Sequence, residues 1–327
     1  MDDAISLSTL LDQVFVFERY GEVLVLLQNS LYAGALVGLV GGIIGTFVMM
    51  RDLAFAVHGV SELSFAGGAI ALLAGTSIVT GSLLGSVIAA LLIGLLGARS
   101  RAANSVVGVL MPFGLGLGIL ALSLYQGRSA NQFALLTGQI VSVSEIQLVS
   151  IAILSVVVLA GLGLLWRPLS FASLDPAVAQ ARGLPIRTLS IVFMLLLGVA
   201  VALSVQIIGA LLVLALLVTP AAAAMSLTAS PGRVVVLSVV FAEVSMVGGT
   251  LLALGGSLPI SPYVTTISFL LWGIARLLGR RRSGRRLPRS ARTTGEEGQR
   301  PAQSRTGSAA GSIEMTAGPE PTGSPSA

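Results

Sequence analysis

The stretch Arg51–Gly75, RDLAFAVHGVSELSFAGGAIALLAG, is apolar over most of its length and yet carries ionisable side chains in its interior. About 20 such residues are enough to cross a bilayer as an α-helix. His58, which is the only histidine of the chain, and Glu62 lie four residues apart. On a helix this spacing places both side chains on one face, with their Cβ atoms roughly 5–6 Å apart. The stretch therefore predicts a transmembrane helix with a polar pair in it.

This pair has three chemical interpretations. Ionisable groups at membrane depth are costly, and they usually face the interior of a helical bundle or a water-filled path. A neutral imidazole and a carboxylate together suit a first-row divalent metal ion. A charge-assisted hydrogen bond that only ties helices together, or a proton relay, would use the same two side chains. From these residues alone, all three interpretations stay open.

The composition of the whole chain is that of an all-α polytopic membrane protein. Of its 327 residues 54% are hydrophobic and only 10% are charged, and the mean hydropathy is +0.94. Soluble domains do not have this composition. With no cysteine, the chain has no disulfides and no thiolate metal sites.

The basic residues indicate a membrane surface and exclude nucleic acid as the partner. All 19 basic residues are arginine, and the sequence pI is about 10.6. Ten of these arginines lie between Arg276 and Arg305, at or beyond the end of the last apolar segment. Such a cluster suits the cytoplasmic surface of a bilayer that contains anionic lipids.

The hydropathy pattern divides the chain into three parts. Residues 1–28 form an amphipathic segment expected at the interface, residues 29–279 form the transmembrane domain, and residues 280–327 form a basic and then disordered cytoplasmic tail. About nine transmembrane helices are predicted, over residues 29–50, 53–75, 77–97, 105–125, 146–165, 187–205, 207–226, 234–254 and 262–279.

Arginine placement predicts the orientation of these helices, because cytoplasmic loops carry an excess of basic residues. With the C-terminal cluster in the cytoplasm, all loop arginines except Arg19 and Arg128 fall on the cytoplasmic side. One cytoplasmic loop, residues 166–190, is the longest polar interruption between predicted helices. Within it Asp175 and Pro176 suit the N-cap and first position of a short helix, which Gly183 and Pro185 would end.

Four stretches together resemble one family, the permease subunits of the ABC importers for manganese, zinc and iron. The resemblance runs from about Leu31 to Leu278. The four stretches are GLVGGIIGTFVMMRDLAFAVHGVSELSFAGGAIALLAG (38–75), LLTGQIVSVS (135–144), LDPAVAQARGLPIRTLS (174–190) and IIGALLVLALLVTPAAAA (207–224). This resemblance implies that the chain has the permease fold of the metal and metal-chelate importers and lies in a bacterial-type plasma membrane.

The resemblance also implies partners for the chain. They are a second permease chain, identical or paired, a cytoplasmic dimer of ABC ATPase subunits, and an extracytoplasmic metal-binding protein. A divalent transition metal would be the substrate, with no permanently bound cofactor. The short helix at 175–183 would be the coupling helix that contacts the ATPase, through Asp175, Pro176, Ala181, Gly183 and Pro185. The chain itself would be no enzyme, and without a lysine it cannot form a G-x-x-x-x-G-K-[ST] nucleotide loop.

The chain departs from the family at the polar pair. The family usually has an aspartate at the position of His58 and a histidine at the position of Glu62, so the order of acid and imidazole is inverted here. Both ligand types nevertheless stay on one helical face. We expect His58 and Glu62 to be transient metal ligands, of which a symmetric dimer would supply four.

Two other transport functions remain as alternatives. An importer of metal chelates such as siderophores would share the architecture, and a proton-coupled carrier could use the pair as a relay, although no internal repeat supports it. An intramembrane metalloprotease needs H-E-x-x-H, which one histidine excludes. Elsewhere, Glu243 is expected to be a buried group bonded to a neighbouring helix, and Pro220 is expected to cause a kink. Gln206 and Asn131 are expected to be rim or loop groups.

Overall fold

A computed structural model describes residues 27–96, 100–127, 135, 138, 143–254 and 260–283 of the chain. The chain divides into two units, residues 1–284 and residues 285–327, and all of the described residues belong to the first. The predictions for the N-terminal segment, most of the loop at 127–144 and the tail beyond residue 283 concern parts outside these ranges.

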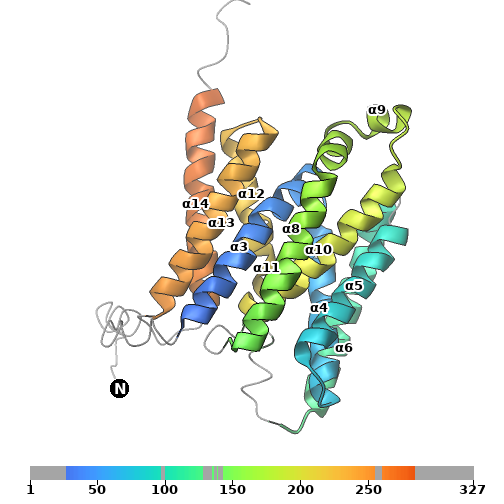
Figure 1. Cartoon of the computed structure of the whole chain (residues 1–327), viewed down its shortest axis with the longest axis vertical. Coiled ribbons are helices and arrows are strands. Elements are labelled where there is room, and N and C mark those ends of the chain that lie inside the picture. The colour runs from blue at the N-terminus through green and yellow to red at the C-terminus, as the bar shows by residue number, and fades with distance from the viewer. Residues whose placement is uncertain are drawn as a thin grey trace, which may run out of the picture. The chain divides into compact units, whose positions relative to one another are not determined.

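The described part of the chain is all helical, which confirms the predicted fold class (Figure 1). Eight of its helices are long and apolar enough to cross a membrane. These eight are α3 (Gln28–Met50), α4 (Ala54–Leu73), α5 (Ile78–Leu96), α6 (Ser100–Leu124), α8 (Glu145–Leu174), α10 (Ile186–Ile208), α13 (Pro231–Leu254) and α14 (Ile260–Ser283). The shorter ones are α9 (Pro176–Ala181), the 3-10 turn η1 (Ala210–Leu212), α11 (Val213–Leu217) and α12 (Thr219–Leu227).

Helix α4, which carries the polar pair, is the most buried of the eight. The structure buries 78% of its spanning segment, compared with 22% for α6 and for α8. It packs against α5, α6, α10 and α11. The pair therefore lies on a central helix of the bundle.

Glycines allow the helices around α4 and α3 to approach closely. A Cβ atom on Gly67 of α4 would collide with the carbonyl oxygen of Gly81 on α5, and one on Gly85 would collide with that of Leu63. On α3, a Cβ atom on Gly42 would lie 2.6 Å from the Cα atom of Val239 on α13. Close contact through small residues is how helices associate in lipid, where the hydrophobic effect between them is absent.

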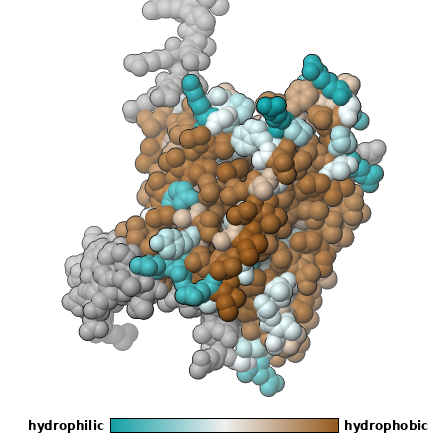
Figure 2. Space-filling model, viewed as in Figure 1, coloured by the Kyte–Doolittle hydropathy of each residue, from teal (hydrophilic) through white to brown (hydrophobic). Residues whose placement is uncertain are grey.

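The outer surface of the bundle is apolar, as a chain surrounded by lipid requires. Figure 2 shows hydrophobic residues over most of the side of the helices, with hydrophilic residues gathered mainly toward the two ends. Helix α8 presents the clearest stripe, formed by Ile146, Val149, Ile153, Val156, Val157 and Leu164, all more than half exposed.

The predicted span over 207–226 is not one helix but three short elements. Helix α10 ends at Ile208, Gly209 has φ 81° and ψ 159°, and η1, α11 and α12 follow. A second break, at Val218, precedes Pro220 near the start of α12, which agrees with the expected kink. Non-helical backbone at membrane depth is tolerated where protein buries it or where it lines a cavity.

Helix α8 is longer than predicted and shortens the loop that follows. It continues from residue 165 through Trp166, Arg167 and Pro168 to Leu174, because Leu169 and Ala172 in this extension are buried against the bundle. The loop then turns through α9, which lies at the same end of the bundle as the C-terminal end of α14 (Figure 1).

Candidate functional site

His58 and Glu62 lie one turn apart on α4, and their side chains face each other. His58 Nε2 is 3.8 Å from Glu62 Oε1. Glu62 is 3% exposed, whereas His58 is 23% exposed. The structure thus brings together the two residues that the sequence singled out, with the imidazole at the more open side of the pair.

Each residue of the pair keeps a buried atom that has no hydrogen-bond partner among the residues that the structure describes. These atoms are His58 Nδ1 and Glu62 Oε2. The nearby hydroxyl of Ser61 donates to the backbone carbonyl of His58 at 2.8 Å and so does not serve the side chains. Buried polar groups in native proteins are nearly always bonded, and an unbonded one often marks a functional group or a missing ion or water. The geometry leaves both side chains free to bind a third species.

One chain offers too few ligands here to hold a metal ion permanently. Among the residues that the structure describes, no group of three or more His, Cys, Asp or Glu side chains could hold an ion. A structural metal site normally has four ligands from the protein. Two side chains suit an ion that pauses while other ligands come from its own waters or from a second chain.

Arg51 closes the turn between α3 and α4, just before the helix that carries the pair. Its guanidinium carbon lies 5.1 Å from the centre of the Phe193 ring on α10. Burial lowers the pKa of the Arg51 guanidinium from its usual value. This cation–π contact joins the turn before α4 to the third turn of α10.

Glu243 lies midway along α13, away from the pair on α4. Its carboxyl group packs on α3, where a Cβ atom on Gly38 would lie 3.3 Å from Oε1. The expected hydrogen bond to a neighbouring helix is not found among the described residues. Gly38 leaves room for the group without supplying a donor, and Glu243 is only partly buried, not fully buried as expected.

The short helix α9 has the capping predicted for it. Asp175 Oδ1 accepts hydrogen bonds from the backbone N–H groups of Ala177 and Val178, and Pro176 is the first helical residue. After Ala181, the last residue of the helix, Gly183 adopts φ 82°, which favours glycine.

The residues after α9 end the helix and turn the backbone toward α10. Leu184 N–H donates to the Ala179 carbonyl and Gly183 N–H to that of Gln180, the bonding pattern of a Schellman motif. Pro185 then precedes α10. Six residues are thus held as a rigid, exposed turn of helix between two long helices.

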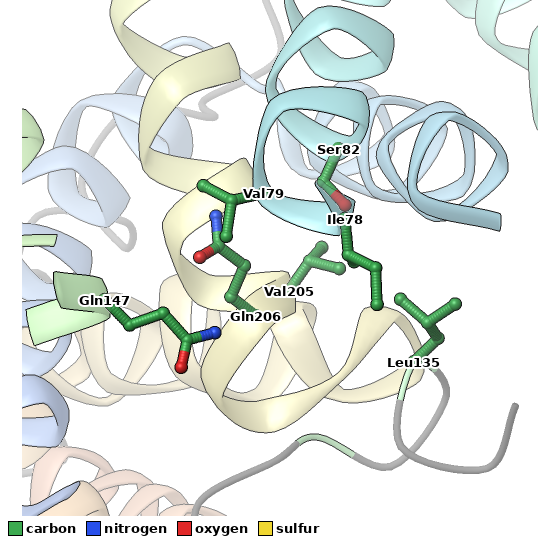
Figure 3. A pocket seen from close by; sticks show the side chains of 7 residues that line it. All are labelled: Ile78, Val79, Ser82, Leu135, Gln147, Val205 and Gln206. Atoms are coloured by element: carbon green, nitrogen blue, oxygen red, sulfur yellow. The ribbon is translucent and has the colours of Figure 1, made fainter. Parts of the chain in front are cut away.

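Gln206, which was expected to be a rim or loop group, is a helical residue in the last turn of α10 and not a loop residue. It lies within α10, which continues to Ile208, and its Nε2 atom is buried with no hydrogen-bond partner in the described part of the chain. The side chain lines a small cavity together with Ser82 and Gln147 (Figure 3). Asn131, treated in the same way from sequence, is outside the described residues.

The sequence of the chain is similar to one family of membrane transport proteins. A model of the "ABC 3 transport family" matches residues 24–278. The manganese transport system membrane protein MntC of Halalkalibacterium halodurans is 33% identical over 224 residues, 68% of this chain and 77% of its own length. The high-affinity zinc uptake system membrane protein ZnuB of Haemophilus influenzae is 24% identical over 76% of this chain and 95% of its own.

Solved structures share the fold at low sequence identity. PsaBC from Streptococcus pneumoniae, solved in complex with Fab, superposes with a TM-score of 0.71 at 23% identity, over 80% of this chain and 95% of that one. A metal-chelate type ABC transporter in an inward-facing conformation gives a TM-score of 0.61 at 21% identity, over 76% and 85%.

Proposed function

The chain belongs to the ABC 3 transport family, and on this premise we propose that it is the membrane-spanning permease subunit of an ABC transporter that imports a divalent transition metal ion, manganese, zinc or iron. The observation that carries this proposal is the His58–Glu62 pair on a central, spanning helix, with one unpartnered atom on each side chain. Relatives named for manganese and zinc transport support the same substrate class.

In this proposal the ion passes between two permease chains. His58 and Glu62 of each chain act as transient ligands, so a symmetric pair supplies two imidazoles and two carboxylates. Four such groups suit a transient site that coordinates a divalent ion in tetrahedral or distorted octahedral geometry. The exposed side of His58 supports this arrangement, because the imidazole remains accessible from outside its own chain.

ATP hydrolysis in this proposal takes place on a separate ATPase dimer, which binds α9 as the coupling helix. The capping of α9 by Asp175 and Gly183 supports this role, because a coupling helix must stay folded while the ATPase moves against it. The α9 end of the bundle and the C-terminus face the cytoplasm of a plasma membrane, and an extracytoplasmic metal-binding protein delivers the ion to the opposite end. The arginine bias supports this orientation.

The metal is tested by uptake in the host strain that lacks this chain. We expect uptake of at least one radiolabelled ion among manganese, zinc and iron to fall to background, and growth to stop when that metal is limiting. Returning the chain on a plasmid should restore both. If uptake of all three bare ions is normal while uptake of an iron chelate is lost, the chain is a chelate importer instead.

The C-terminal tail is expected to be dispensable for transport, because its composition of Arg, Ser, Gly, Pro, Thr and Glu cannot bury a core. A stop codon after Arg292 should leave metal uptake near the wild-type rate. The measurement is radiolabelled uptake normalised to the amount of the chain in the membrane. Loss of uptake by a truncated chain that still accumulates would show that the tail takes part in transport.

A further inference from the structure

The turn that connects α3 to α4 packs against the two helices that flank α9. The Arg51 guanidinium carbon lies 5.1 Å from the centre of the Phe193 ring on α10. One turn earlier, on α3, the Phe47 ring packs edge-on against Phe193, with 6.3 Å between ring centres, and against Trp166 on α8, with 5.3 Å. These four residues, which we call the aromatic–arginine cluster, therefore hold α3, α8, α10 and the turn before α4 together.

The centre of this cluster is closely packed. Phe47 and Phe193 are both fully buried. Aromatic rings packed edge to face attract each other beyond the burial of their surfaces, because the positive edge of one meets the negative face of the other. Packed cores shift between discrete arrangements and do not deform continuously. We therefore expect a displacement of α10 to carry Phe47 and Arg51 with it.

The positive charge of Arg51 has the Phe193 ring as its partner. A guanidinium group is always charged in proteins. Arg51 Nη1 is buried and has no hydrogen-bond partner among the described residues, and Arg51 forms no ion pair in that part of the chain. A cation over the face of an aromatic ring is attracted by the electrons of the ring. Because the described residues offer the charge no other partner, the position of the guanidinium depends on Phe193.

The turn between α3 and α4 is short, and backbone hydrogen bonds hold it. The Asp52 N–H donates to the Met49 carbonyl at 3.4 Å and the Leu53 N–H donates to the Val48 carbonyl at 2.9 Å, the two bonds of a Schellman motif. Asp52 has φ 54°, a conformation that glycine usually occupies in this motif. Helix α4 begins directly after Leu53. Arg51 and the first turn of α4 therefore belong to one rigid corner of the chain.

The cluster lies between α9 and the polar pair. Phe193 is in the third turn of α10, and α10 starts directly after the bonded turn that follows α9. On the other side of the cluster, His58 lies about 7.5 Å beyond Leu53 along the axis of α4. Rigid helices and chains of packed side chains are the physical means by which distant sites are coupled.

Helix α9 is also tied to α8, the second helix that the cluster holds. Arg182 is the C-cap of α9, and its guanidinium carbon lies 5.9 Å from the centre of the Phe171 ring on α8. Trp166, the member of the cluster on α8, precedes Phe171 in the same helix. Both helices that flank α9 therefore connect it with the cluster.

We propose that Arg51 is a positioning residue that couples α9 to the polar pair. Its contact with Phe193 makes the start of α4, and with it His58 and Glu62, follow α10 when the ATPase moves α9. This inference rests on the proposed function. In this role Arg51 binds neither the metal ion nor ATP, so its loss leaves ATP hydrolysis intact and separates it from transport.

The test measures uptake of the radiolabelled metal ion and ATP hydrolysis by the complete transporter in the same proteoliposomes. Arg51→Met keeps a long side chain without the charge, and Phe193→Leu keeps an apolar side chain without the ring. Each should lower the amount of metal taken up per ATP hydrolysed by about fivefold, within the range that residues coupling two sites contribute. Arg51→Lys, which keeps a cation for the ring, should recover most of this ratio. The double variant should be no worse than either single variant, because both substitutions remove the same contact.

Arg276→Met is the matched control. The Arg276 guanidinium carbon also lies over an aromatic ring, 5.7 Å from the centre of Trp272, but both residues belong to α14, so the contact joins no two helices. Its substitution should leave the ratio of uptake to ATP hydrolysis unchanged. The amount of each variant and of its bound ATPase is measured as well, because a merely structural role would lower uptake and hydrolysis together. If Phe193→Leu does not accumulate, Arg51→Met and Arg51→Lys decide the test.

The results separate this inference from the proposed function. If the wild-type transporter takes up a metal ion and Arg51→Met keeps the wild-type ratio, the inference is overturned and the proposed function stands. The same holds if the losses of Arg51→Met and Phe193→Leu add in the double variant, or if Arg276→Met lowers the ratio equally. If the wild-type transporter takes up none of the metal ions, the proposed function fails and the inference fails with it.

Discussion

His58→Ala and Glu62→Ala should each reduce metal uptake by about 10- to 100-fold, the range that removal of groups supporting a bound metal produces. Each substitution removes one of only two ligands that this chain offers in the site, so in a symmetric pair of chains two of four ligands disappear. The variants should still accumulate in the membrane and assemble with the ATPase. Radiolabelled uptake, normalised to membrane abundance and to the ATPase that co-purifies, is the measurement.

The exchange His58→Asp with Glu62→His is the sharper variant. It restores the order of acid and imidazole that is usual in the family and leaves the same two ligand types one turn apart on α4. If the pair acts through metal ligation, this double variant should transport far better than either single alanine variant. Its preference among manganese, zinc and iron is measured at the same time, because the two ligands exchange their exposed and buried positions.

If His58 and Glu62 form a purely structural ion pair, the expected results for the variants are different. Removing one partner would then leave the other buried and unpaired, at a cost of about 3–5 kcal/mol, and the alanine variants would be lost from the membrane. Replacing both residues by leucine would be tolerated, as apolar replacement of buried ion pairs often is. A stable His58→Leu, Glu62→Leu chain that transports normally would therefore end the metal-site interpretation.

The sequence predicted the pair well because its geometry is local. An i,i+4 spacing on an uninterrupted apolar run determines which face the two side chains share, and the structure places Nε2 and Oε1 3.8 Å apart. The caps of α9 were predictable for the same reason, since Asp175, Pro176 and Gly183 act within their own turns. What sequence could not predict was that α4 is the most buried of the eight spanning helices, which depends on the glycine contacts with its neighbours.

The break after Ile208 and the cavity beside it were missed because both depend on distant segments. The run from 207 to 226 is apolar except for Thr219 and Ser226 and looks like one continuous span. Gly138 lies close to the carbonyl oxygen of Ile207, and the Ser261 hydroxyl donates a hydrogen bond to that of Ile208, so two distant parts of the chain contact the helix end. The one local signal was Gly209 itself, whose positive φ favours glycine.

Gly183→Trp should abolish uptake while ATP hydrolysis by the assembled transporter continues. Gly183 has φ 82°, a conformation that is strained for tryptophan, and a Cβ atom there would meet nothing of this chain within 4 Å. The damage would therefore come from a shifted turn after α9 and from a large ring on the surface offered to the ATPase. Both effects disturb coupling and leave the spanning helices intact.

Two matched variants separate coupling from general damage. Gly183→Asn keeps the left-handed conformation, which asparagine tolerates better than other residues, and should transport nearly normally. Gly163→Trp places the same ring at another exposed glycine with nothing within 4 Å, within the spanning part of α8 and away from the surface proposed to contact the ATPase, and should also transport. Uptake and ATPase activity are measured on the same membranes. Normal uptake by Gly183→Trp would show that the turn after α9 is not needed for coupling, and an equal loss in Gly163→Trp would show that the effect does not depend on the position of the ring; either result would remove the coupling role from α9.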